Sequence, residues 1–166
     1  GYMVQAIGYS YNHTYFAGNY SSNLNIKAIV PIYPGSKLLR WGYKLFELGD
    51  LLWFINRDTP IISGTSDPDS ATFNPLWVYL DPLYLTSNES GQVIIPNTFL
   101  VQGTHDFQVP PAWSRDFEAH LRLHKRKVIA GYYPLAAHVF DTFPWSTYGQ
   151  SVLYYTSHFI RLSCIA

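Results

Sequence analysis

Cysteine and charge are the two things this chain has little of. It contains one cysteine, Cys164, in 166 residues, so it can form neither an internal disulfide nor a metal cluster of thiolates. Charged residues make up 13% of the chain, against about 25% in an average globular protein. The 11 basic and 11 acidic side chains cancel to a net charge of zero and form no basic block, which argues against a nucleic-acid partner.

The chain also lacks a long apolar run and a signal-peptide pattern. No uncharged apolar stretch reaches the ~20 residues that a membrane helix needs. Gly1 is not an initiator residue and a strand-like run follows it closely, so we expect the chain to be a piece of a longer protein. Three N-x-S/T triplets begin at Asn12, Asn19 and Asn88. They favour a secretory or extracellular protein but leave the localisation open.

Aromatic side chains are abundant, and strand-like and helix-like segments alternate between them. The 14 Tyr, 10 Phe and 5 Trp make up 17% of a chain that is long enough for one domain with a sizeable core. The sequence pattern predicts strands over 3–8, 26–33, 98–103 and 127–133, and helices over 11–20, 111–124 and 146–162. Because parallel strands need crossovers of a dozen or more residues, this order predicts an α/β fold with a doubly wound, mostly parallel sheet.

The segment 37–95 differs from the rest of the chain. Apolar residues recur at three- and four-residue steps from Leu38 to Ile55, which predicts amphipathic helices, and a loop-rich stretch follows. We interpret 37–95 as a cap-like or lid-like insertion in a single domain of 166 residues. The helices of 38–55 either pack on the protein's own sheet, which is the plainer interpretation, or contact a lipid surface.

Three residues with the chemistry of nucleophilic catalysis follow three of the predicted strands. Ser10 follows the first strand in Gly8-Tyr9-Ser10-Tyr11-Asn12, which approaches the G-x-S-x-G of a nucleophile elbow with Asn12 in place of the second glycine. Asp106 follows the third strand and His138 the fourth. The carboxyl ends of parallel strands meet at one edge of a sheet, so we expect the three side chains to lie together. Their order along the chain is that of α/β-hydrolases and differs from chymotrypsin-like and subtilisin-like proteases.

Two longer motifs carry a resemblance to the esterases and lipases of the α/β-hydrolase superfamily. The run 95–106 with 109–111 resembles their acid-bearing segment H-G-x-x-D-x-x-V-P-P, with Gln102 in place of the histidine. The run 138–141, His-Val-Phe-Asp, resembles the H-x-F-D of hormone-sensitive-lipase-like and related carboxylesterases. The resemblance extends from about residue 4 to residue 162. It covers the C-terminal half of the family fold, without the early strands or the H-G-G loop.

The resemblance implies a role for each of these residues. Ser10 would be the nucleophile, His138 its general base and then acid, and Asp106 the group that orients the imidazole. The backbone N–H of Tyr11 would supply half of the oxyanion hole. The chemistry needs no cofactor and no metal. The missing N-terminal half, or a second chain, is expected to complete the fold.

These observations predict a serine hydrolase that cleaves small apolar carboxylic esters through an acyl-enzyme. Two alternatives remain open. A prolyl-oligopeptidase-like peptidase has an elbow G-x-S-Y-G-G that shares the tyrosine after the serine, although 37–90 and the H-x-F-D run argue against it. A non-catalytic interaction protein with the α/β-hydrolase fold is motivated by Asn12, the missing half of the fold and the sparse charge. His120 and His124 are spaced by four residues, but no carboxylate completes a metal site with them.

Overall fold

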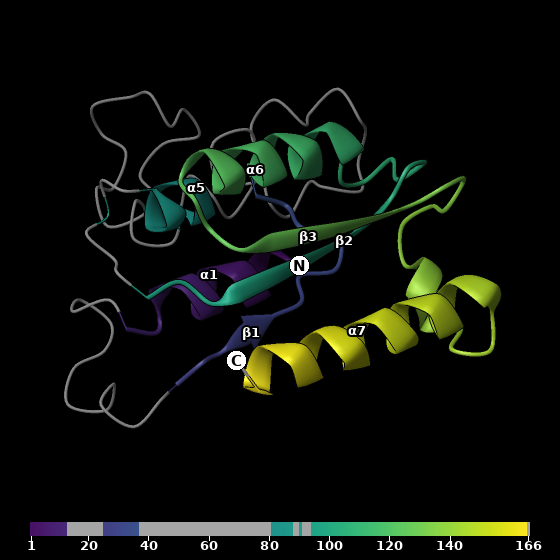
Figure 1. Cartoon of the computed structure of the whole chain (residues 1–166). Helices are drawn as coiled ribbons and strands as arrows, with labels where there is room; N and C mark the ends of the chain where they lie inside the picture. Colours follow the sequence, from purple (N-terminus) through teal and green to yellow (C-terminus); the bar gives the residue numbers. More distant parts are fainter. Residues whose placement is uncertain (13–24, 37–80, 88–89, 91–93, 166) are drawn as a thin grey trace.

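A parallel sheet lies between two layers of helices (Figure 1). The computed structural model of the chain describes residues 1–12, 25–36, 81–87, 90 and 94–165. Their elements in chain order are α1 (Tyr2–Ser10), β1 (Ala28–Ile29), α5 (Pro82–Thr86), β2 (Asn97–Gly103), α6 (Pro111–Leu123), β3 (Val128–Tyr133), the short 3₁₀ helix η6 (Phe140–Thr142) and α7 (Thr147–Ile165).

The three described strands lie in the order β1-β2-β3, and both pairs are parallel. β2 pairs with β3 in register from Thr98 opposite Val128 to Gly103 opposite Tyr133. β1 is short, and an isolated bridge from Ile32 to Val101 continues its pairing beyond Ile29. The loops that follow all three strands therefore meet at one edge of the sheet.

Each face of the sheet has its own apolar core, because successive side chains of a strand point to opposite faces. Leu100 of β2 faces the layer of α1, α5 and α6 and packs among Tyr9, Leu85, Phe117 and Leu121. Its neighbours Phe99 and Val101 face α7 on the other side, where they pack among Tyr133, Ala136 and Val152. A strand covered on both faces reads as a nearly continuous apolar run, and β2 has that pattern.

The structure confirms the parallel α/β sheet and most of the predicted elements. The strands predicted over 98–103 and 127–133 and the helices predicted over 111–124 and 146–162 match β2, β3, α6 and α7 within about three residues. The strand predicted over 26–33 is present as β1 and the Ile32 bridge. The strand predicted over 3–8 is wrong, because these residues belong to helix α1.

The insertion predicted over 37–95 lies largely outside the described residues, as does most of the helix predicted over 11–20. The described end of the insertion contains α5, whose first turn is capped by the Asp81 carboxylate accepting from the N–H of Leu83 at 3.0 Å. In the part of the chain that the structure describes, no helix combines the length and apolar character needed to span a bilayer.

Candidate functional site: a buried aspartate and histidine at the sheet edge

Asp106 lies in the loop after β2 and has a fully buried carboxylate that accepts four hydrogen bonds. Its Oδ1 accepts from the backbone N–H groups of Gln108 and Val109, at 2.9 and 2.8 Å. Its Oδ2 accepts from the Gln102 side-chain amide at 3.0 Å and from His138 Nδ1 at 2.8 Å. A buried charge is stable only when its oxygens are satisfied in this way. The sequence prediction that Asp106 and His138 lie together is therefore confirmed.

The two loops that carry this pair are joined by backbone hydrogen bonds. The N–H of Thr104 donates to the carbonyl of Tyr133 at 3.0 Å, and the N–H of His105 donates to that of Ala136 at 3.0 Å. The loops also touch at Gly103, where a Cβ atom would lie 2.3 Å from the carbonyl oxygen of Ala136. Only glycine fits such a contact, which brings the loop of Asp106 against the loop of His138.

His138 presents one ring nitrogen to Asp106 and keeps part of its ring exposed. Because an ionised carboxylate can only accept, Nδ1 carries a proton, and in the neutral imidazole Nε2 is then the nitrogen with the lone pair. The His138 side chain is 22% exposed, whereas that of Asp106 is 0% exposed. A neutral histidine held in this way by a carboxylate has the arrangement that general-base catalysis needs.

Tyr33, in the loop after β1, lies beside this pair. Its ring centroid is 4.4 Å from that of His138, and its hydroxyl donates to Oδ1 of Asp141, three residues after the histidine. Burial, and then the hydrogen bond to Asp141, raise the pKa of Tyr33, so the hydroxyl stays protonated. The backbone of Tyr33 is left-handed, with φ 52°, a conformation that a tyrosine rarely adopts without support from its surroundings.

Sequence reasoning missed Tyr33 although a signal was present. Tyr33 is the last residue of the strand predicted over 26–33, and Asp106 and His138 come shortly after the ends of two others, so the rule that functional groups collect at the carboxyl ends of parallel strands includes it. The backbone of its loop is fixed to the sheet, since the N–H of Tyr33 donates to the Val101 carbonyl at 2.9 Å. Three successive loops of one sheet edge thus contribute to the site.

Ser10 does not join this site, which corrects the prediction of a nucleophile elbow. It is the last residue of α1, and the helix continues into Tyr11 with φ −57° and ψ −31° rather than turning sharply. The preceding Tyr9 has its hydroxyl 2.8 Å from Thr98 Oγ1, at the start of β2. Asp106 follows the other end of that strand. At ~3.3 Å per residue, the seven residues of β2 separate Ser10 from Asp106 by roughly 20 Å.

The neighbours of Ser10 are placed accordingly. Tyr11, predicted to offer an oxyanion-hole N–H, is the C-cap of α1 at the same distant end. Asn12 does not occupy the glycine position of an elbow, because its Nδ2 donates to the carbonyl of Ile94 at 3.3 Å, before β2 begins. Figure 1 shows α1 running against the direction of the strands, so its amino end, not its carboxyl end, lies toward the Asp106 edge.

The amino end of α1 is packed tightly against the loop of Tyr33. A Cβ atom on Gly1 would lie 2.3 Å from the carbonyl oxygens of both Ile32 and Tyr33. Tyr33 in turn stacks beside His138. The first residue of the chain is thus a glycine in close backbone contact at the edge of the sheet that holds Asp106 and His138.

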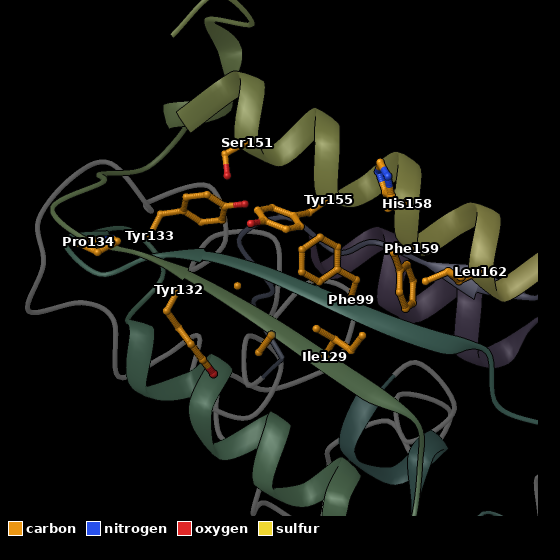
Figure 2. A pocket seen from close by; sticks show the side chains of 12 residues that line it. Phe99, Ile129, Tyr132, Tyr133, Pro134, Ser151, Tyr155, His158, Phe159 and Leu162 are labelled. Carbon is orange, nitrogen blue, oxygen red and sulfur yellow. The ribbon is translucent and has the colours of Figure 1, made fainter. Parts of the chain in front are cut away.

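An apolar cavity of about 500 Å³ lies between α7 and the sheet, away from the Asp106–His138 pair. Figure 2 shows Phe99, Tyr133, Tyr155 and Phe159 gathered between helix and sheet, with Tyr132 pointing to the opposite side. Neither Asp106 nor His138 lines this cavity. Among the described residues, no group of three or more His, Cys, Asp or Glu side chains could hold a metal ion.

No family model and no curated protein matches the sequence. Among solved structures, propionate-bound esterase 2 of Thermogutta terrifontis is similar at 18% identity and TM-score 0.54, covering 81% of this chain and 42% of the esterase. Esterase B of Lactobacillus rhamnosis in an inhibited form is similar at 16% identity and TM-score 0.66, covering 98% and 50%. A second structure of esterase B gives 15% identity with the same TM-score and coverage.

These similarities concern the fold. The chain spans about half the length of the esterases it matches. Together with the parallel sheet and its flanking helices, they identify the described residues as the C-terminal part of an α/β-hydrolase fold.

Proposed function

We propose that the protein containing this chain is a serine hydrolase that cleaves carboxylic esters, and that the chain supplies its general base, His138, and the orienting carboxylate, Asp106. The observation that carries the proposal is the 2.8 Å hydrogen bond from His138 Nδ1 to a fully buried and fully satisfied Asp106. The esterase neighbours support the same reaction class. Because the chain spans about half the length of these esterases, we propose the activity for the whole protein and not for this chain alone.

The amino end of α1 is the position best suited to the nucleophile. In a nucleophile elbow the serine stands between a strand and a helix, and the glycine two residues later packs closely on neighbouring backbone. Gly1 would suit that glycine, because it lies beside the amino end of α1 and a Cβ atom there would lie 2.3 Å from the carbonyl oxygens of Ile32 and Tyr33. The serine would then lie two residues before Gly1. The positive end of the dipole of α1 would favour an oxyanion there.

With a nucleophile at that position, the reaction needs no cofactor. His138 Nε2 takes the proton of the serine hydroxyl as its oxygen attacks the ester carbonyl, and returns the proton to the departing alcohol. A water molecule, deprotonated by His138 in the same way, then attacks the acyl-enzyme and releases the carboxylic acid and the free serine. Asp106 stays ionised and stabilises the imidazolium that forms in each half-reaction.

Short apolar acyl groups are the substrates we propose. The neighbour from Thermogutta terrifontis is described with bound propionate and, in another structure, with bound butyrate. The chain adds few charges to attract an ionic substrate, since 13% of its residues are charged and its net charge is zero. Small uncharged esters such as p-nitrophenyl butyrate fit both observations.

The non-catalytic alternative loses one of its three supports, which are Asn12, the missing half of the fold and the sparse charge. Asn12 does not stand at the place of an elbow glycine, because it lies at the other end of the sheet, bonded to Ile94. In the proposed elbow Gly1 would take the glycine position, with the close backbone contact that such a turn requires.

The complete protein, assayed with p-nitrophenyl butyrate, tests the proposal. His138→Gln should lower kcat/KM by about 10³-fold or more, because it removes the base. Ser10→Ala serves as the control, because it removes a buried hydroxyl far from His138, and it should change kcat/KM by less than about threefold. A fluorophosphonate should label a serine on the amino side of Gly1. Labelling of Ser10, or full activity of His138→Gln, would overturn the proposal.

A further inference from the structure

A buried amide and hydroxyl lie directly behind the Asp106 carboxylate. Gln102 is the second-to-last residue of β2 and is 0% exposed. Its Nε2 donates to Asp106 Oδ2 at 3.0 Å and to the carbonyl oxygens of Gly103 and Val109 at 3.2 Å each. Its Oε1 accepts from the hydroxyl of Ser114, in α6, at 2.8 Å. Ser114 is also fully buried.

This network allows one orientation of the amide. If the amide turned over, Oε1 would face three acceptors, namely a carboxylate and two carbonyls, at hydrogen-bonding distance. Such an arrangement of buried acceptors is strongly unfavourable. The Ser114 hydroxyl donates to the oxygen in the observed orientation and so holds the N–H groups toward Asp106.

The oxygen that Gln102 contacts is the one that faces the imidazole. Asp106 Oδ1 is held by two backbone N–H groups, whereas Oδ2 is shared between Gln102 Nε2 and His138 Nδ1. Without Gln102, the only side chain holding Oδ2 among the described residues is the histidine that the carboxylate is meant to orient. The position of Oδ2 would then follow the movements of His138 instead of limiting them.

We propose that Gln102, oriented by Ser114, is a positioning residue that fixes Asp106 Oδ2 against His138 Nδ1. The proposal rests on the proposed function, in which His138 is the general base. Gln102 and His138 each hydrogen-bond to Asp106 Oδ2, so Gln102 would act on the imidazole through the carboxylate. Because its amide is neutral, it holds the carboxylate without competing with the imidazolium as a counter-charge. A histidine at this position, as in the resembling motif, would also donate an N–H but would be titratable.

Substitutions in the complete protein test the role. Gln102→Leu should lower kcat for p-nitrophenyl butyrate by roughly 10- to 100-fold, with KM nearly unchanged. Losses of that size are seen in metal sites when a hydrogen-bond partner that orients a ligating side chain is removed. Ser114→Ala should have a smaller effect in the same direction, and Gln102→His should restore most of the rate. The proton resonance of His138 Nδ1–H should shift upfield and broaden in Gln102→Leu, since its acceptor is no longer fixed.

Thr98→Val is the matched control. Thr98 is equally buried on the same strand and hydrogen-bonded through its side chain to Tyr9, but lies at the opposite end from Asp106. It should lower the melting temperature and leave kcat and the His138 resonance unchanged. An unchanged kcat and resonance in both Gln102→Leu and Ser114→Ala would overturn the positioning role, even where His138→Gln abolishes activity. A protein inactive before any substitution would overturn the proposed function instead, while the resonance would still report on positioning.

Discussion

The Asp106–His138 loops and helix α1 are both attached to β2, but they are held in different ways. In the loops, every oxygen of Asp106 and the amide of Gln102 are hydrogen-bonded, so polar bonds fix the geometry. In α1, the buried Gln5 donates to Ser36, but its Oε1 has no hydrogen-bond partner among the described residues. Tyr9 adds one buried hydrogen bond to Thr98, and otherwise Gly1, Gly8 and Tyr9 hold the helix by close fit. The loops should therefore be sensitive to lost bonds and backbone spacing, and α1 to shape.

The largest expected difference between the two regions is at their glycines. Gly103→Ala would bring a Cβ to 2.3 Å from the backbone oxygen of Ala136, so we expect it to lower the free energy of unfolding by about 2–4 kcal/mol. Gly8→Ala would bring a Cβ to 2.6 Å from Cγ2 of Ile29, a buried and β-branched side chain that would have to shift, whereas the obstacle at Gly103 is backbone. Alanine favours a helix over glycine by about 1 kcal/mol and offsets part of that cost, so the loss at Gly8 should be smaller than the loss at Gly103.

Urea unfolding of the complete protein measures both changes. The comparison also tests whether Gly8 lies in a helix, because alanine offsets part of its cost only there. A loss at Gly8 as large as that at Gly103 would mean that residues 1–10 are not packed as this helix, and would reopen the role of Ser10.

The same two regions show what the sequence could and could not predict. The loop after β2 was predictable because several independent requirements coincide there: an apolar strand, a glycine at its end, a carboxylate and a Val-Pro-Pro start to the next helix. Each has a separate physical reason, so a chance match is rare. The hydrogen bond between Gln102 and Ser114 was not predictable, because it joins two segments by geometry rather than by spacing. For Tyr33 the place at the sheet edge was predictable, but its contact with His138 was not.

Residues 1–10 offered a weaker signal that pointed the wrong way. A short apolar run does not distinguish a strand from a helix, and G-x-S occurs often by chance. The buried residues of this helix are Gln5, Ala6, Gly8, Tyr9 and Ser10, whereas Met3 and Ile7 are 65% and 59% exposed. The i, i+3, i+4 pattern is therefore present, but two of its members are polar and one is a glycine, while large apolar side chains are exposed. A search for apolar periodicity does not find it.

An intermediate effect is expected at Tyr33, which links the two regions. Tyr33→Phe removes the hydrogen bond to Asp141 but keeps the ring beside His138, so we expect a loss of stability of about 1 kcal/mol and a small change in kcat. Tyr33→Leu also removes the ring and should cost about 1 kcal/mol more. Urea unfolding and p-nitrophenyl butyrate kinetics of the two variants separate the contributions. Equal kcat values for Tyr33→Phe and Tyr33→Leu would show that the ring of Tyr33 does not support His138.

The smallest effect concerns Tyr9, which fixes the carboxyl end of α1 to the start of β2. Burial raises the pKa of Tyr9 above its ordinary value of about 10, with the hydrogen bond to Thr98 opposing. The neutral hydroxyl is therefore favoured by the folded state, and its contribution to stability is fully present below pH 10 and lost as the pH rises above it. Between pH 9 and 10.5 this one group should remove about 0.8 kcal/mol from the free energy of unfolding.

Tyr9→Phe should show a correspondingly shallower fall over that interval, whereas Tyr154→Phe, a matched loss of a hydroxyl from an exposed tyrosine of α7, should follow the parent curve. If Tyr9→Phe and the parent protein fall in parallel, Tyr9 is not buried against Thr98, and the orientation of α1 that separates Ser10 from His138 is wrong.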